Sequence, residues 1–107
     1  MTERESHIAK MIGDRIKMKD PKAEVILFGS HARVQANDES DWDILILIDK
    51  PKPNRLGEKK YRDEIFQIEL ELGVAISTII YSKFDWESRY VFSSLYKNIQ
   101  QEGVKIA

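Results

Sequence analysis

The sequence has no cysteine, which excludes disulfide bonds and thiolate metal sites and leaves the redox compartment undetermined. It has no excess of charge either, because 17 lysine and arginine residues face 18 aspartate and glutamate residues, for a net charge of -1. Such a chain has no overall attraction for nucleic acid or for an anionic membrane. Any polyanion must therefore bind at a local site.

A long apolar run is also missing, since the longest one is far below the roughly 18 residues that a membrane span needs. The first residues, MTERESHIAKMIGDRIK, are too charged for a signal peptide. We therefore expect a cytoplasmic protein without a membrane contact. At 107 residues and 42% hydrophobic content, the chain is expected to form one domain, residues 1–107, around one modest core.

Apolar spacing predicts the order helix, strand, short helix, strand, helix, strand, helix. The first helix covers residues 3–18, and the strands cover residues 25–28, 42–49 and 74–81. The second strand is apolar on both faces and is therefore expected at the centre of the sheet. This order is typical of an α/β protein with two layers and a small mixed sheet of three to four strands.

Turn residues and apolar positions refine this outline. Gly29-Ser30 ends the first strand, and Ser30 is expected to cap a short helix over residues 31–34. Residues 37–40 predict a polar loop, and residues 50–56, with two prolines, predict an exposed loop. The helix that Gly73 ends is expected to bury Tyr61, Ile65, Ile68 and Leu72, with a wider face at Phe66 and Leu70. The helix that Gly103 ends has apolar positions at Val91, Phe92, Leu95 and Ile99.

Two aspartates at the start of the second predicted strand are the best candidates for metal ligands. Asp41 and Asp43 are two residues apart on an extended segment, so their carboxylates project from one face, about 6.5 to 7 Å apart at the backbone. Paired carboxylates suit Mg²⁺, which completes its octahedron with water and substrate phosphates. Trp42 between them must point to the opposite face and pack in the core.

A phosphate site is predicted at the end of the preceding strand. Ser30 offers a hydroxyl and a backbone N–H where a helix begins, and Gly29 lets a ligand approach the backbone closely. Arg33 is expected either to contact a phosphate or to form a structural salt bridge. His31 is expected on the solvent-facing side of the helix, and His7 on the surface. Together, a metal and a phosphate cradle indicate phosphoryl or nucleotidyl transfer.

The spacing of Gly29-Ser30, ten further residues and then Asp41-Trp42-Asp43 resembles the signature of the minimal nucleotidyltransferases of the polymerase-β-like superfamily. The resemblance covers nearly the whole chain. It implies that Gly29 and Ser30 bind the phosphates of a nucleoside triphosphate and that Asp41 and Asp43 hold two Mg²⁺ ions. It further implies transfer of a nucleotide, most simply AMP from ATP, to a protein, with this chain as the antitoxin of a small helical HEPN partner.

The family's pattern includes a third carboxylate on the later strand. The matching position in this chain is Ser77, which has a neutral hydroxyl instead. Asp49 is roughly 20 Å along the same strand from Asp43 and is no substitute, and Glu69 and Glu71 are expected on the solvated side of their helix. A second, milder departure is Val34, where the family often has glycine. One of the two Mg²⁺ ions would thus lose a charged ligand.

Three functions therefore remain open from the sequence. The first is the Mg²⁺-dependent nucleotidyltransferase. The second is a catalytically weakened nucleotide and metal-binding module that acts on its partner by contact. The third is a nucleotide-binding domain with no toxin partner. Nucleic acid has no direct support as a partner, and the oligomeric state is left open, a homo-oligomer included.

Overall fold

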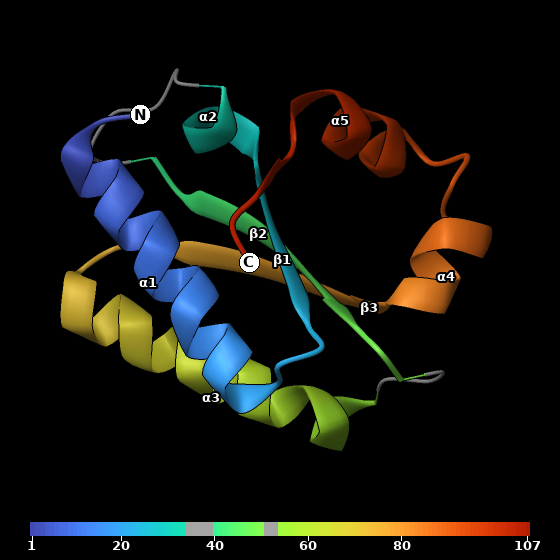
Figure 1. Ribbon diagram of the computed structural model, residues 1–107, viewed down its shortest axis with the longest axis horizontal. Helices are drawn as coiled ribbons and strands as arrows, with labels where there is room; N and C mark the ends of the chain where they lie inside the picture. Colours follow the sequence, from blue (N-terminus) through green and yellow to red (C-terminus); the bar gives the residue numbers. More distant parts are fainter. Residues whose placement is uncertain (34–39, 51–53) are drawn as a thin grey trace.

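The computed structural model describes residues 1–33, 40–50 and 54–107 and contains a four-stranded sheet with helices on both faces (Figure 1). Its elements are α1 (Glu3–Lys19), β1 (Glu24–Phe28), α2 (Gly29–Ala32), β2 (Trp42–Ile48), α3 (Arg55–Leu72), β3 (Ile76–Ser82), α4 (Lys83–Ser88), α5 (Ser94–Glu102) and β4 (Val104–Lys105). Val34, the predicted loop at 37–39 and residues 51–53 lie outside the described residues. Among the described elements, no helix is both long and apolar enough to cross a membrane.

The strands lie in the order β3-β2-β1-β4, so β2 is an interior strand, as its apolar sequence predicts. β1 pairs with β2 and with β4 in antiparallel fashion, whereas β2 and β3 are parallel. The predicted α/β class and mixed sheet are confirmed, and the number of strands is four. β4 was not predicted, because its two residues are both exposed and show no apolar alternation.

The core lies on both faces of the sheet because alternate residues of β2 point to opposite sides. Trp42, Ile44 and Ile46 pack with residues of α1 and α3, and Leu45 and Leu47 pack with residues of α4 and α5. Figure 1 shows α1 beside α3, with α4 and α5 grouped apart from them. The sequence predicted two layers, the sheet and one layer of helices. In the structure, α4 and α5 form a further layer on the second face of the sheet.

Local capping defines the ends of the two long helices. Thr2 and Glu5 form a reciprocal capping box at the start of α1. The Asn54 side chain accepts a hydrogen bond from the Gly57 N–H, so α3 begins at Arg55 and the predicted exposed loop at 50–56 is two residues too long. Gly73 ends α3 with a φ of 67°, the left-handed conformation that glycine adopts without a Cβ clash.

Three apolar side chains that were predicted to be buried are exposed. Phe66 and Leu70 of α3 are 56% and 63% exposed, because α3 packs on the sheet and α1 through a narrower stripe of Tyr61, Ile65 and Ile68. Phe92 is 85% exposed and, like Val91, precedes α5, which begins at Ser94 with Ser93 as its cap. Helical spacing alone made these two helical faces too wide.

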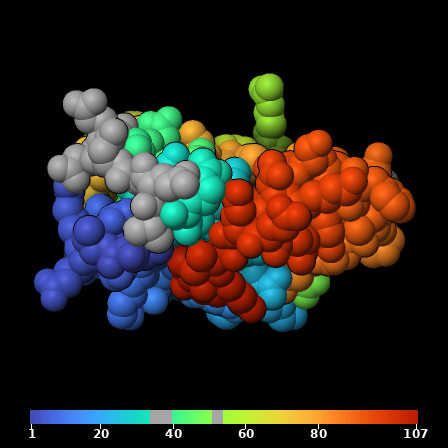
Figure 2. Space-filling view, turned by 90° about the horizontal axis from the view of Figure 1, so that it is seen from above, coloured from blue at the N-terminus to red at the C-terminus, as the bar shows by residue number. Residues whose placement is uncertain are grey.

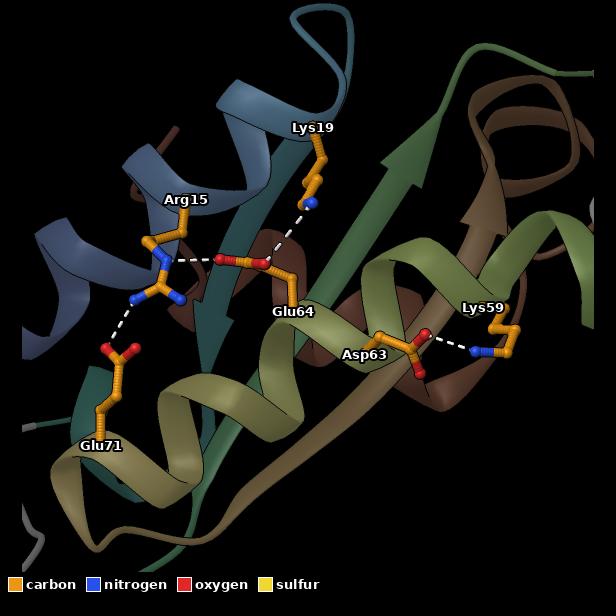
Figure 3. Close-up of polar contacts among 6 residues, drawn as sticks. All are labelled: Arg15, Lys19, Lys59, Asp63, Glu64 and Glu71. Carbon is orange, nitrogen blue, oxygen red and sulfur yellow. Dashed lines mark hydrogen bonds and ion pairs between the residues drawn. The ribbon is translucent and has the colours of Figure 1, made fainter.

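An ionic cluster joins α1 to α3, the two helices that cover the same face of the sheet (Figure 3). The Arg15 side chain of α1 lies between two acids of α3: it donates from Nε to Glu64 and from Nη1 to Glu71 Oε2, the latter at 2.6 Å. Lys19 Nζ lies 3.8 Å from the other Glu64 oxygen. Glu64 is only 13% exposed at its side chain, so its charge depends on these cations more than a surface carboxylate would.

Replacing Arg15 by methionine is expected to lower the free energy of unfolding by about 1 to 3 kcal/mol, because Glu64 loses its closest cation while remaining half-buried. Urea unfolding measures the effect. The matched control is Lys59→Met, which breaks the Lys59–Asp63 pair drawn in Figure 3, whose side chains are 66% and 63% exposed. That change is expected to cost less than about 0.5 kcal/mol. Equal losses in the two variants would contradict this account.

Candidate functional site

The antiparallel register of β1 and β2 places the Gly29 turn beside Asp43. Phe28, the last residue of β1, is the partner of Asp43, and Gly29 follows it with a φ of 75°. A Cβ built on Gly29 would overlap the Asp43 carboxylate. Glycine is therefore required at position 29 for two reasons, its backbone conformation and the close approach of the Asp43 carboxylate. The group that approaches its backbone is the Asp43 side chain.

The parallel register of β2 and β3 places Ser77 next to Asp43 on the other side. Asp43 and Ser77 are register partners, so their side chains lie on the same face of the sheet, on strands about 5 Å apart. Asp43 is half-buried, whereas Ser77 and Asp41 are exposed. Asp41 directly precedes β2, and Trp42 between the two acids is 2% exposed and packs in the core, as predicted.

Burial and the neighbouring charge of Asp41 raise the pKa of the Asp43 carboxyl, burial being the larger cause. The charges of His31 and Arg33 act in the opposite direction. Within the described residues, no lysine or arginine forms an ion pair with Asp41 or Asp43. Asp43 is thus a partly buried carboxylate beside the like charge of the exposed Asp41, at the end of the sheet.

These carboxylates have the chemistry of a site for one hard divalent cation, which would relieve their repulsion and take its other ligands from water and phosphate. A site with three protein carboxylates is not formed by the described residues, among which no three acidic or histidine side chains gather. Glu69 cannot complete the set, because it accepts a hydrogen bond from the Ile76 N–H at 2.9 Å. Glu71, the other acid considered on this helix, pairs with Arg15.

Arg33 and Ser30 lie beside the pair on and after α2. Arg33 donates from Nη1 to Glu102 Oε2 of α5 at 3.0 Å, so the salt bridge foreseen as one of two alternatives is present, with 40% of the arginine side chain still exposed. Seen from above, α2 lies between α5 and the start of α1 (Figure 2). The prediction that Ser30 caps the helix is wrong, because α2 already begins at Gly29 and its cap position is Phe28.

His31 is where the sequence-based expectation fails most. It was expected to face solvent, but it is only 4% exposed and stacks on Trp42 with ring centroids 3.9 Å apart and planes 10° apart. Its Nδ1 lies 2.9 Å from Glu5 Oε2 and its Nε2 lies 3.0 Å from the Ser40 carbonyl oxygen. The hydrogen bond to His31 is the largest cause of a lowered Glu5 pKa. No local pattern signals these contacts, because Glu5 is 26 residues away. His7 is exposed, as expected.

Comparison with known proteins shows the family and the fold of the chain. Residues 9–106 match the family model of the nucleotidyltransferase domain. A protein of Methanocaldococcus jannaschii, named as a candidate protein adenylyltransferase, is 34% identical over 89 residues, which is 83% of each chain. A crystal structure of a toxin–antitoxin with AMP-PNP shares the fold, with a TM-score of 0.64 and 17% identity over 94% of this chain and 72% of that one.

The chain belongs to the nucleotidyltransferase domain family.

Gly29→Ala is expected to lower the free energy of unfolding by more than about 2 kcal/mol and to displace the Asp43 carboxylate, because positive φ and steric overlap act together. Gly73→Ala is the matched control, since its φ is 67° and its Cβ would have no neighbour within 4 Å. It should cost only the backbone strain, about 1 kcal/mol. Chemical denaturation of both variants gives the difference, and equal costs would contradict the close approach of Asp43.

Asp43→Asn is expected to raise the melting temperature of the metal-free protein by a few degrees at pH 7. Because the folded pKa of Asp43 is raised, folding favours the protonated carboxyl, and stability is lost as pH rises from its unfolded pKa through its folded one. The gain from asparagine should therefore vanish at low pH. Melts in EDTA across this range test it, with the exposed Asp49→Asn as control. A lower melting temperature for Asp43→Asn at pH 7 would contradict the proposed repulsion.

Proposed function

We propose that this protein binds ATP together with Mg²⁺ and transfers AMP to a hydroxyl group of a protein partner. The observation that carries the proposal is the pairing of Asp43 with Phe28 on β1 and with Ser77 on β3. It brings the Gly29-Ser30 turn and the Asp41–Asp43 pair to one end of the sheet. Family membership supports the class of reaction. The name of the Methanocaldococcus jannaschii relative supports a protein as the acceptor and AMP as the transferred group.

Each residue of the site has a part in this proposal. Asp41 and Asp43 hold the cation, and the Gly29 and Ser30 backbone with the Ser30 hydroxyl binds the phosphates. Arg33, whose charge already acts on Asp43, adds a positive charge on the α5 side of the site. A bound Mg²⁺ would neutralise phosphate charge and orient the triphosphate. Its positive charge would also offset the repulsion between Asp41 and Asp43.

The chemistry balances without a further reactant. The oxygen of an acceptor hydroxyl forms a bond to the α-phosphorus of ATP, and the bond from that phosphorus to the oxygen leading to the β-phosphate breaks. Pyrophosphate leaves, and the hydroxyl proton passes to a base or to water. In this chain the position beside Asp43 has the Ser77 hydroxyl, which at neutral pH is a far weaker base than a carboxylate. Activation of the acceptor is therefore the step for which the site is least equipped.

The proposed partner is a small helical HEPN protein, with this chain as the antitoxin in the cytoplasm. Support comes from the resemblance of the motif and from the shared fold of the toxin–antitoxin crystallised with AMP-PNP.

One observation favours a second candidate, a module that binds nucleotide but acts on its partner by contact. Ser77 stands beside Asp43 in the place of a third carboxylate, and the described residues offer no replacement. Such a protein would bind Mg²⁺ and ATP through Asp41 and Asp43 and would transfer AMP slowly or not at all.

ATP labelled at the α-phosphate, Mg²⁺ and the protein encoded by the neighbouring gene provide the test. We expect label on the partner, a loss of more than about 100-fold with Asp43→Asn, and a rise of at least about tenfold with Ser77→Asp, since a carboxylate restores the missing base and ligand. Ser77→Ala, which is equally close to Asp43 and has no charge, is the matched control and should stay near the unmodified protein.

The outcomes separate the candidates. Unlabelled partner with both the unmodified protein and Ser77→Asp, together with a stable complex, would select the contact module. A melting temperature that ATP and Mg²⁺ together do not raise would contradict the nucleotide site itself, because a ligand that binds only the folded state must stabilise it.

A further inference from the structure

His31 joins three segments that meet at the candidate site. It belongs to α2, its Nδ1 contacts Glu5 of α1, and its Nε2 contacts the Ser40 carbonyl, one residue before Asp41. At 4% exposure it has little access to water. Its polar contacts therefore replace its hydration, and their loss would leave a buried polar ring without partners.

Both contacts of the ring are to acceptors. A carbonyl oxygen can only accept a hydrogen bond, and an ionised carboxylate also only accepts. At 2.9 and 3.0 Å, both distances are those of formed hydrogen bonds. The ring thus links the Glu5 side chain of α1 to the backbone directly before Asp41.

The same ring packs on the residue between the two acids. Its plane lies 10° from that of the Trp42 indole, with centroids 3.9 Å apart. The Trp42 backbone is held as well, because its backbone N–H donates to the Ala75 carbonyl at 2.8 Å. His31 therefore contacts the residues on both sides of Asp41, through Ser40 before it and Trp42 after it. Asp41, itself exposed and outside β2, lies between these two neighbours.

We propose that His31 is a positioning residue of the site: through its contacts with Glu5, the Ser40 carbonyl and Trp42 it fixes residues 40–42 against α2 and α1, so that the carboxylates of Asp41 and Asp43 converge on one cation. The proposal rests on the function proposed above and deepens it. It also assigns a role to Glu5, which holds the ring at Nδ1 in addition to its part in capping α1.

His31→Phe is the first test, because phenylalanine can retain the stack on Trp42 while removing both hydrogen bonds. The affinity for Mn²⁺ with ATP, measured by calorimetry, is expected to fall about 10- to 100-fold, the usual effect of losing a group that orients metal ligands. His7→Phe, at the exposed histidine of α1, is the control and should leave the affinity unchanged. Equal affinity of His31→Phe and the unmodified protein would overturn the proposal.

Glu5→Gln tests the contact at Nδ1. Glutamine keeps one carbonyl oxygen, which preserves the capping box with Thr2, and replaces the Oε2 acceptor beside His31 by an NH2 donor. The Mn²⁺–ATP affinity is expected to fall by less than in His31→Phe, because the stack on Trp42 and the contact with the Ser40 carbonyl remain. A loss as large as that of His31→Phe would contradict the shared role of the three contacts.

Hydrogen exchange separates this proposal from the proposed function. If the unmodified protein binds neither Mn²⁺ nor ATP, the function fails, and the Trp42 amide still reports on positioning. Its exchange is expected to be at least about tenfold faster in folded His31→Phe than in His7→Phe, because the segment before β2 is released. Equal exchange rates would overturn the positioning role whatever the protein binds.

Discussion

The antiparallel pairing of Phe28 with Asp43 is the constraint on which the site depends. It ends β1 directly beside the start of β2, so the chain must turn away at Gly29 without a side chain in the way of the carboxylate. The turn leads at once into α2, which carries Ser30, His31 and Arg33 past the same end of the sheet. A one-residue slip in this register would turn Asp43 to the opposite face, toward α1 and α3. The register of β1 and β2, the glycine at position 29 and the direction of α2 thus depend on one another.

The charges around Asp43 show how the fold holds a destabilising group. Burial and Asp41 raise the pKa of Asp43, while His31 and Arg33 partly compensate. Neither cation pairs directly with the acids: Arg33 is held by Glu102 and His31 by Glu5. An arginine bound directly to the carboxylates would stabilise the metal-free protein but would occupy the place of a divalent cation. The compensation therefore acts from a distance, and the carboxylate oxygens are left for a ligand.

The sequence predicted the parts of the site that depend on local chemistry. A Gly-Ser pair after one apolar run and two acids before another suffice to place Gly29, Asp41 and Asp43 at strand ends, and Gly73 suffices to end α3. It did not predict the burial of His31, because that depends on Glu5 and Trp42, which only the packing of α1 and β2 brings near. The prediction that Phe66 is buried failed for a related reason. Helical spacing shows which side of a helix faces the core, but the width of the buried face depends on the neighbouring elements.

Ser77 shows what the parallel register adds to the motif. The strand that contains it is recognisable from its β-branched residues and has no acid, and the pairing shows that Ser77 is the β3 residue beside Asp43. Glu69 of α3 instead accepts a hydrogen bond from the N–H of Ile76, the first residue of β3. Recruiting Glu69 to the site would expose that backbone group. Among the residues that the structure describes, no third carboxylate therefore reaches the site, and Ser77 stands beside Asp43 instead.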